Sequence, residues 1–355
     1  MQSVDAVVVG AGPNGLVAAN VLADAGWEVL VLEAQPEAGG AVRSGTVTET
    51  GFVHDRYSAF YPLALASPAM QAMGLEDWGV RFCHGPLVVA HPTLDGTCAV
   101  LSRDVEETAA SLEAFAAGDG DAWRRWSAWW DPVGPRLVDA LFRPFPPVRA
   151  TARLLRSLGS PGEVARFAAF GVRSVREHAT SEFRGAGAQR LLTGNALHAD
   201  LHPSSPGGAL FAWMLCGIGQ QLGWPCVQGG AGNLTRALIA RLRAGGGEVR
   251  CDSEVVRVDV CNGRARGVLT RGRHPGRGAP RRAGRCRRTS FVSSSRGRRA
   301  PTAPGAAWAS TLQLRRQHGQ GRLGAACTDP VGEQPGAAIT GGAHHRRCRG
   351  AHAVV

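Results

Sequence analysis

The chain has 355 residues, enough for two domains and a large buried core. Its formal net charge of +12 suggests a nucleic-acid-binding protein, but the charge is unevenly distributed. Residues 271–355 hold 17 Arg and two acidic residues, whereas residues 1–270 hold 23 Arg against 26 acidic residues. We therefore expect no nucleic-acid partner for the larger part of the chain, which is mildly acidic.

The N-terminal segment, residues 5–33, has the order of elements that a dinucleotide-binding site requires. An apolar run leads into the motif G-x-G-x-x-G at residues 10–15, and a helical stretch and a second apolar run that ends at Glu33 then follow. A glycine-rich turn in an unrelated α/β protein would not explain an acid at that position. The sequence therefore predicts a Rossmann-like α/β domain that binds a dinucleotide.

Each part of this motif has a physical role. Gly10 allows the tight turn after the strand, Gly12 lets the backbone approach a pyrophosphate, and Gly15 lets the helix pack closely on the sheet. The N-terminus of the helix offers free N–H groups to the phosphates. Glu33 can accept hydrogen bonds from both ribose hydroxyls and would repel a 2′-phosphate, so we expect no preference for NADP.

The residues after Glu33 favour FAD over NAD. Gly39 and Gly40, followed by Arg43, resemble the second FAD motif of the glutathione-reductase-like flavoproteins. In that motif the backbone follows the pyrophosphate and ribityl chain, and the arginine helps to fix the phosphates. An ordinary turn and a solvated surface arginine are the alternatives for the same residues.

Two further segments, residues 51–55 and 223–238, resemble the phytoene desaturase (carotenoid oxidoreductase) family, in particular its branch of pyridine nucleotide-disulfide oxidoreductase domain proteins. The resemblance covers about residues 4–270. It implies a glutathione-reductase-like FAD-binding domain and hydride transfer between flavin and a hydrophobic substrate such as an isoprenoid. The predicted FAD-binding residues are Gly10, Ala11, Gly12, Pro13, Asn14, Gly15, Glu33, Ala34, Gly39, Gly40, Ala41, Arg43 and Val255. Val255 is included because the family places this strand beside the adenine, and a plain core strand is its alternative.

The resemblance also divides the chain. Residues 1–60 and 223–270 are expected to form the two parts of the FAD-binding domain. Residues 61–222 are expected to form a mixed α+β, mostly helical substrate or cap domain. Residues 271–355 form a basic, low-complexity tail that we expect to be irregular or disordered.

Two features of the cap region have both a structural and a functional interpretation. Trp123, Trp126 and Trp130 recur at helical spacing on a helix expected to end at Asp131-Pro132, and they predict a buried aromatic stripe or the wall of an apolar substrate site. Residues 149–158 form a basic amphipathic segment, which predicts a solvated helix face or a contact with anionic lipid.

No metal site and no catalytic residue are predicted. The nine cysteines show no C-x-x-C and no zinc spacing, so reduced thiols in a cytoplasmic protein are expected. His198, Asp200 and His202 are interpreted as a loop over the substrate cavity, and the 54–55 pair as a flavin contact or a turn. We expect no signal peptide and no membrane span, because no basic segment precedes the first apolar run and no run reaches ~20 apolar residues. Peripheral membrane association stays open, and the sequence does not decide the oligomeric state.

The tail has neither helical nor strand periodicity, and we expect it to be translated out of frame. Shifted codons for residues 281–292 permit an apolar strand, and those for residues 317–331 permit a second family-like segment in the same frame. A genuine basic arm that binds nucleic acid is the alternative. Family members close the FAD site with a later glycine-rich segment, so an inactive truncated relic is one alternative function, and a flavin amine-oxidase-like enzyme is another.

Overall fold

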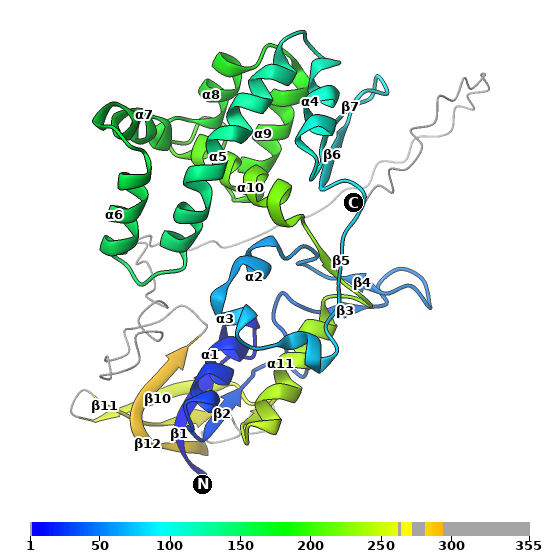
Figure 1. Cartoon of the computed structure of the whole chain (residues 1–355). Helices are drawn as coiled ribbons and strands as arrows, with labels where there is room; N and C mark the ends of the chain where they lie inside the picture. The colour runs from blue at the N-terminus through cyan, green and yellow to red at the C-terminus, as the bar shows by residue number, and fades with distance from the viewer. Residues whose placement is uncertain (1, 262–263, 272–280, 294–355) are drawn as a thin grey trace, which may run out of the picture.

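The computed structural model describes residues 2–261, 264–271 and 281–293, which form two lobes (Figure 1). The strands are β1 (Gln2–Val9), β2 (Val29–Leu32), β3 (Ser44–Gly45), β4 (His54–Asp55), β5 (Phe82–Cys83), β6 (Val89–Pro92), β7 (Cys98–Leu101), β8 (Cys226–Val227), β9 (Glu248–Arg250), β10 (Val255–Cys261), β11 (Arg264–Thr270) and β12 (Arg281–Ser293). The helices are α1 (Pro13–Asp24), α2 (Pro62–Ala66), α3 (Pro68–Gln71), α4 (Val105–Glu113), α5 (Asp119–Leu141), α6 (Val148–Ser157), α7 (Pro161–Val172), α8 (Val175–Glu182), α9 (Ala186–His198), α10 (Gly208–Leu222) and α11 (Gly232–Ala244), with a short 3-10 helix, η1 (Leu75–Trp78).

A sheet of six strands, in the order β10-β11-β12-β1-β2-β9, forms the centre of the lower lobe in Figure 1. β1 pairs in parallel with β2 and with β12, and β2 pairs in parallel with β9. Val4, Val7 and Val8 of β1 are fully buried, as expected for a parallel strand that is covered on both faces. The predicted Rossmann-like α/β architecture is therefore confirmed.

One strand, β12, lies beyond residue 270, where the in-frame sequence pattern predicts none. It pairs in parallel with β1 from Gln2↔Gly284 to Val9↔Ser293, and antiparallel with β11. Strand pairing is made by backbone N–H and C=O groups, so it does not require the side-chain alternation on which the sequence prediction relies. The rest of the predicted tail, residues 272–280 and 294–355, lies outside the described residues.

The upper lobe contains α4 to α10 with the hairpin β6–β7, around an aromatic core. Trp123, Trp126 and Trp130 are buried there, which confirms the structural interpretation of the tryptophan stripe. The helix does not end at Asp131-Pro132 as predicted, since α5 continues to Leu141 with two prolines inside it. Val133 is buried in the core, and such tertiary packing offsets the cost of about 3 kcal/mol that proline imposes within a helix.

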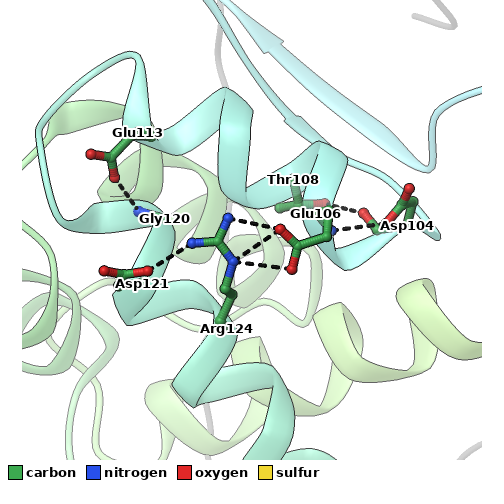
Figure 2. A network of polar contacts seen from close by, with 7 residues as sticks. All are labelled: Asp104, Glu106, Thr108, Glu113, Gly120, Asp121 and Arg124. Carbon is green, nitrogen blue, oxygen red and sulfur yellow. Dashed lines mark hydrogen bonds and ion pairs between the residues drawn. The ribbon is translucent and has the colours of Figure 1, made fainter.

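A network of polar side chains joins α4 to α5 on the surface of this lobe (Figure 2). Asp104 caps α4 by accepting a hydrogen bond from the N–H of Glu106 at 2.8 Å. Arg124 of α5 then pairs with Glu106 and with Asp121, each at 2.7 Å. The ion-pairing side chains of Glu106, Asp121 and Arg124 are exposed, so we assign the network a structural role, in which it holds α4 against the start of α5.

The chain passes between the lobes at two short strands, β5 and β8, which pair antiparallel with Cys83 opposite Cys226. The segment before β5 belongs to the lower lobe, because Tyr61, Met73 and Val80 are buried in the same core as β1 and α11. The lobe boundary therefore lies at β5 and not at residue 61. No helix among the described residues is long and apolar enough to cross a membrane.

Candidate functional site

A cleft of about 430 Å³ lies at the carboxyl ends of β1 and β2. In parallel α/β sheets this edge is where ligands bind. The residues that line the cleft are Val9, Gly10, Gly12, Pro13, Asn14, Leu32, Glu33, Ala34, Gly40, Ala41, Glu254 and Val255. Nine of the thirteen predicted cofactor residues are among them, so the fold brings together segments far apart in the sequence.

The glycines shape this cleft by letting backbone segments approach one another. Gly10 turns the chain with φ of 94°, a conformation that favours glycine. A Cβ on Gly15 would lie 2.1 Å from the carbonyl oxygen of Gly10, so only glycine allows α1 to pack this closely on the turn. A Cβ on Gly12 would meet only the Cα of Gly40, at 3.9 Å. Gly12 is therefore open toward the cleft, as a close ligand contact requires.

The N-terminus of α1 is suited to an anion. Gly12 is the N-cap residue, Pro13 begins the helix, and neither a side-chain cap nor an acidic residue occupies the first turn. The first N–H groups of a helix have no partner within it, and the helix dipole adds a partial positive charge there. A diphosphate in the cleft would meet these N–H groups directly.

Glu33 is held in place by two backbone N–H groups. Ala11 donates to Glu33 Oε2 at 2.7 Å, and Gln35 donates to Oε1 at 2.9 Å. Each carboxylate oxygen can accept a second hydrogen bond. The side chain lines the cleft with that capacity free, so its geometry fits a vicinal diol such as a ribose.

The other four predicted residues support the cleft without lining it. Ala11 fixes Glu33, Gly15 packs on the Gly10 carbonyl, and Gly39 takes a φ of 123° in the turn before Gly40. Arg43 donates from Nε to the Gly40 carbonyl at 2.8 Å and lies over the ring of Tyr57. In this structure Arg43 thus stabilises its own loop, and its predicted contact with phosphate remains a prediction.

Three lining residues were not predicted: Val9, Leu32 and Glu254. Val9 and Leu32 are the last residues of β1 and β2, and the position of the cleft at the carboxyl ends of parallel strands would have identified them. Glu254 precedes β10, and its position depends on how that strand joins the sheet, so no local signal indicates it.

The 54–55 pair holds a turn. Asp55 Oδ1 accepts hydrogen bonds from Ser44 Oγ and from the N–H of Ala231, each at 2.7 Å, and Ser44 Oγ accepts from the N–H of Gly232 at 2.8 Å. These bonds satisfy N–H groups at the start of α11 and attach it to the hairpin β3–β4. The predicted flavin contact is not needed to explain Asp55.

The described residues contain no group of three or more His, Cys, Asp or Glu that could hold a metal ion. His198 ends α9, and its ring packs against Trp224 with centroids 5.1 Å apart. His202 and Asp200 follow in the loop after that helix. Asp200 and His202 thus lie in a loop as predicted, whereas His198 belongs to the helix, and the predicted position of the loop over a substrate cavity remains a prediction.

Comparison with protein families and curated proteins identifies a nucleotide-binding domain and several relatives. The family model of the NAD(P)-binding Rossmann-like domain matches residues 8–73. The chain is 32% identical over 126 residues to a component of the limonene dehydrogenase of Castellaniella defragrans, a match that covers 35% of the chain and 22% of that protein. It is 33% identical over 156 residues to hydroxyneurosporene desaturase of Cereibacter sphaeroides, a match that covers 43% of the chain and 30% of that protein. It is 27% identical over 299 residues to pyridine nucleotide-disulfide oxidoreductase domain-containing protein 2 of Rattus norvegicus, a match that covers 76% of the chain and 51% of that protein.

Solved structures show the same fold with different functions. A putrescine oxidase variant has a TM-score of 0.50 at 18% identity and covers 82% of the chain and 57% of the oxidase. A Rab GDI from Plasmodium falciparum also has a TM-score of 0.50 at 10% identity, and the match covers 82% of the chain and 65% of the Rab GDI. The fold alone therefore does not decide the function. The chain spans about half, or less, of the length of the curated relatives it matches. It contains an NAD(P)-binding Rossmann-like domain. The relatives of this chain include a dehydrogenase and a desaturase, and they confirm the resemblance to the phytoene desaturase type of oxidoreductase.

Proposed function

We propose that this chain provides the FAD-binding and cap parts of an oxidoreductase of the phytoene desaturase type, which transfers a hydride between flavin and a hydrophobic, isoprenoid-like substrate. The observation that carries the proposal is Glu33, held by two N–H groups at the edge of a glycine-lined cleft. Two of the sequence relatives are named as a limonene dehydrogenase and a hydroxyneurosporene desaturase, which supports the substrate class.

The residues of the cleft fit the ADP half of the cofactor. Glu33 would accept from the ribose hydroxyls, the first turn of α1 would bind the diphosphate, and Val255 would lie against the adenine. FAD, when bound, supplies the isoalloxazine ring that accepts the hydride. The protein's share of the chemistry is orientation of the two partners and exclusion of water, and no catalytic base is assigned.

Replacement of Glu33 tests the site. We expect the full-length chain, reconstituted with FAD and desalted, to retain flavin absorbance, and Glu33→Gln to bind FAD about tenfold more weakly, because a charge-assisted acceptor is lost. Flavin fluorescence titration measures the dissociation constants. Glu49→Gln is the control, because Glu49 lies in an exposed loop away from the cleft.

Competition by nucleotides and a substrate assay separate the alternatives. ADP and NAD should displace FAD better than NADP, because Glu33 would repel a 2′-phosphate. Bleaching of the bound flavin by an isoprenoid polyene supports the desaturase type, whereas hydrogen peroxide formed from an amine would support the amine-oxidase alternative. A chain that stays colourless after reconstitution would reject the cofactor site, and so would equal FAD binding by Glu33→Gln and Glu49→Gln.

We also propose that the reading frame changes by one nucleotide near residue 271. β12 lies between β11 and β1 in the sheet, and the shifted frame permits an apolar strand for these residues, whereas the encoded sequence contains five arginines. Sequencing of the gene and transcript across this position checks the proposal. We expect a missing or additional base, and correcting it should restore a longer flavoprotein-like reading frame. An unbroken frame in independent isolates would contradict the proposed frameshift.

A further inference from the structure

The two strands that connect the lobes carry a pair of cysteines directly opposite each other. Cys83 ends β5, Cys226 begins β8, and the antiparallel register pairs them although they are 143 residues apart. The Cys226 thiol lies 3.6 Å from the backbone oxygen of Cys83. Cys83 is exposed and Cys226 is half-buried, so a small reagent can reach the pair.

The register of β5 and β8 also sets the distance between the Cα atoms of Cys83 and Cys226. Gln228 donates to the carbonyl of Arg81 at 2.8 Å, which makes these two residues a hydrogen-bonded pair. Such pairs alternate along antiparallel strands, so Cys83 and Cys226, two positions farther on, form another, with Cα atoms about 5.5 Å apart and side chains on one face. A disulfide requires a Cα separation of about 4.4–6.8 Å, which this pair meets. It also requires a Cβ separation of about 3.5–4.5 Å, so the Cβ atoms of the pair, about 5.5 Å apart at such a position, must approach by about 1 Å as the bond forms.

We propose that Cys83 and Cys226 form a thiol–disulfide exchange site that accepts small-molecule disulfides of the glutathione type. The Cys83 thiolate attacks the disulfide and releases one reduced thiol, and Cys226 then attacks the mixed disulfide and releases the second. The two cysteine thiols lose two electrons and two protons, and the small disulfide is reduced to two thiols. The product is a covalent bond between the two chain crossings that join the lobes.

Burial and the neighbouring sulfur agree with this order of attack. Burial, and secondarily the proximity of Cys83, raises the pKa of the Cys226 thiol. The exposed Cys83 is therefore the entry point, and Cys226 reacts once the mixed disulfide is held beside it. Cys216, fully buried in α10, has a pKa raised further by burial and is not accessible to the reagent.

Mapping of the disulfide tests this site. The folded full-length chain is incubated with oxidised glutathione, free thiols are blocked with N-ethylmaleimide, and the peptides are analysed by mass spectrometry. We expect a Cys83–Cys226 cross-linked peptide that has lost two hydrogens, and an increased melting temperature, because the bond closes a long loop. Cys83→Ser should abolish both effects, and Cys98→Ser, which alters a half-buried cysteine in β7, should retain them.

Two outcomes would overturn the proposal. One is a glutathione adduct on Cys83 without a cross-link, and the other is a set of cross-links equally distributed among other cysteines. The readout does not depend on FAD, so it stands apart from the test of the cofactor site.

The tip of the α5–α6 hairpin, far from the two cysteines in sequence, presents apolar side chains to solvent. Phe145 is 88% exposed and Val148 is 67% exposed. Val148, Ala152 and Leu155 form a stripe along α6, and with residues 145–147 and 151 they line a shallow apolar depression. The opposite side of α6 faces the core through the buried Ala150 and Leu154.

A row of arginines runs beside this apolar stripe. Arg149, Arg153 and Arg156 recur at helical spacing, each one position after a residue of the stripe. Residues 141–158 contain four arginines and no acidic residue. Asp139 pairs with Arg153 and with Arg143, each at 2.7 Å. Arg149 and Arg156 make no ion pair within the described part of the chain. An apolar stripe next to cations is the pattern of a helix that lies in a lipid interface.

We infer that this hairpin tip, residues 141–156, docks on an anionic lipid bilayer. Co-sedimentation with phosphatidylcholine vesicles, with and without phosphatidylserine, tests the surface. We expect binding only with the anionic lipid, a loss of about fivefold per arginine in Arg149→Gln and Arg156→Gln, and a similar or larger loss in the Phe145→Ser/Val148→Ser double variant.

Val172→Ser is the matched control, because Val172 is equally exposed at the end of α7 but lies outside the patch. Equal binding to neutral vesicles, or equal effects of the control and the double variant, would reject lipid docking. A dimer in sedimentation velocity without vesicles that the double variant abolishes would assign the patch to self-association instead.

Discussion

Gly15→Ala is expected to destabilise the lower lobe by at least about 3 kcal/mol, because overpacking costs typically 1–3 kcal/mol and the obstacle here is backbone. The new Cβ would lie 2.1 Å from the Gly10 carbonyl oxygen, and neither α1 nor the turn can move without opening the sheet. The helix propensity of alanine favours the substitution by only about 1 kcal/mol. Urea unfolding followed by circular dichroism measures the loss.

Two matched variants isolate the cause. Gly171→Ala places the same methyl group in α7 with nothing within 4 Å, so its unfolding midpoint should stay or rise slightly. Gly12→Ala has room in the apo fold, since Gly12 has φ of -73° and a distant neighbour, and it should fold normally but bind FAD at least about tenfold more weakly. An unchanged midpoint for Gly15→Ala would show that α1 does not pack on the turn as described.

Mild acid is expected to destabilise the upper lobe at pH values above those at which most carboxylates titrate. Trp126 Nε1 donates to His178 Nε2 at 2.9 Å, so this ring nitrogen must be unprotonated. Burial, and secondarily the nearby positive charge of Arg173, lowers the pKa of His178 to about 4. Phe170 packs edge-on against the ring with centroids 4.9 Å apart, and the buried Nδ1 atom of His178 has no hydrogen-bond partner among the described residues.

The sign of the effect follows from proton binding. An unfolded histidine has a pKa near 6.5, so below that pH the unfolded chain takes up a proton that the folded chain does not. Stability is complete above about pH 6.5 and is lost as the pH falls toward 4, by an amount on the order of 3 kcal/mol. Burial also lowers the pKa of His91, which adds to the loss in the same range.

Chemical denaturation at several pH values between 7 and 4 measures this slope. His178→Gln keeps an acceptor for Trp126 but cannot titrate, so it should flatten the slope substantially and leave the part due to His91. His202→Gln, which alters an exposed histidine, should leave the slope unchanged. The same slope in His178→Gln and in the parent chain would exclude His178 as the source.

Much of the candidate site could be predicted from the sequence because the residues that form it are set by local rules. The turn at Gly10, the approach at Gly12 and the acid that ends β2 are set by neighbours within one βαβ unit, and spacing along the chain is enough to identify them. The tryptophan stripe was equally accessible, since three residues at helical spacing define one face. The prolines of α5 misled the prediction because burial of Val133 outweighs a local helix-breaking preference.

The sequence by itself therefore determined the nucleotide-binding turn, the position of Glu33 and the apolar elements of both lobes. Only the tertiary structure placed Glu254 at the cleft, β12 beside β1, the lobe boundary at β5, and Cys83 opposite Cys226. Each of these depends on contacts between segments far apart in the chain, and the free energy of such contacts comes from packing and pairing partners that no local window of sequence contains.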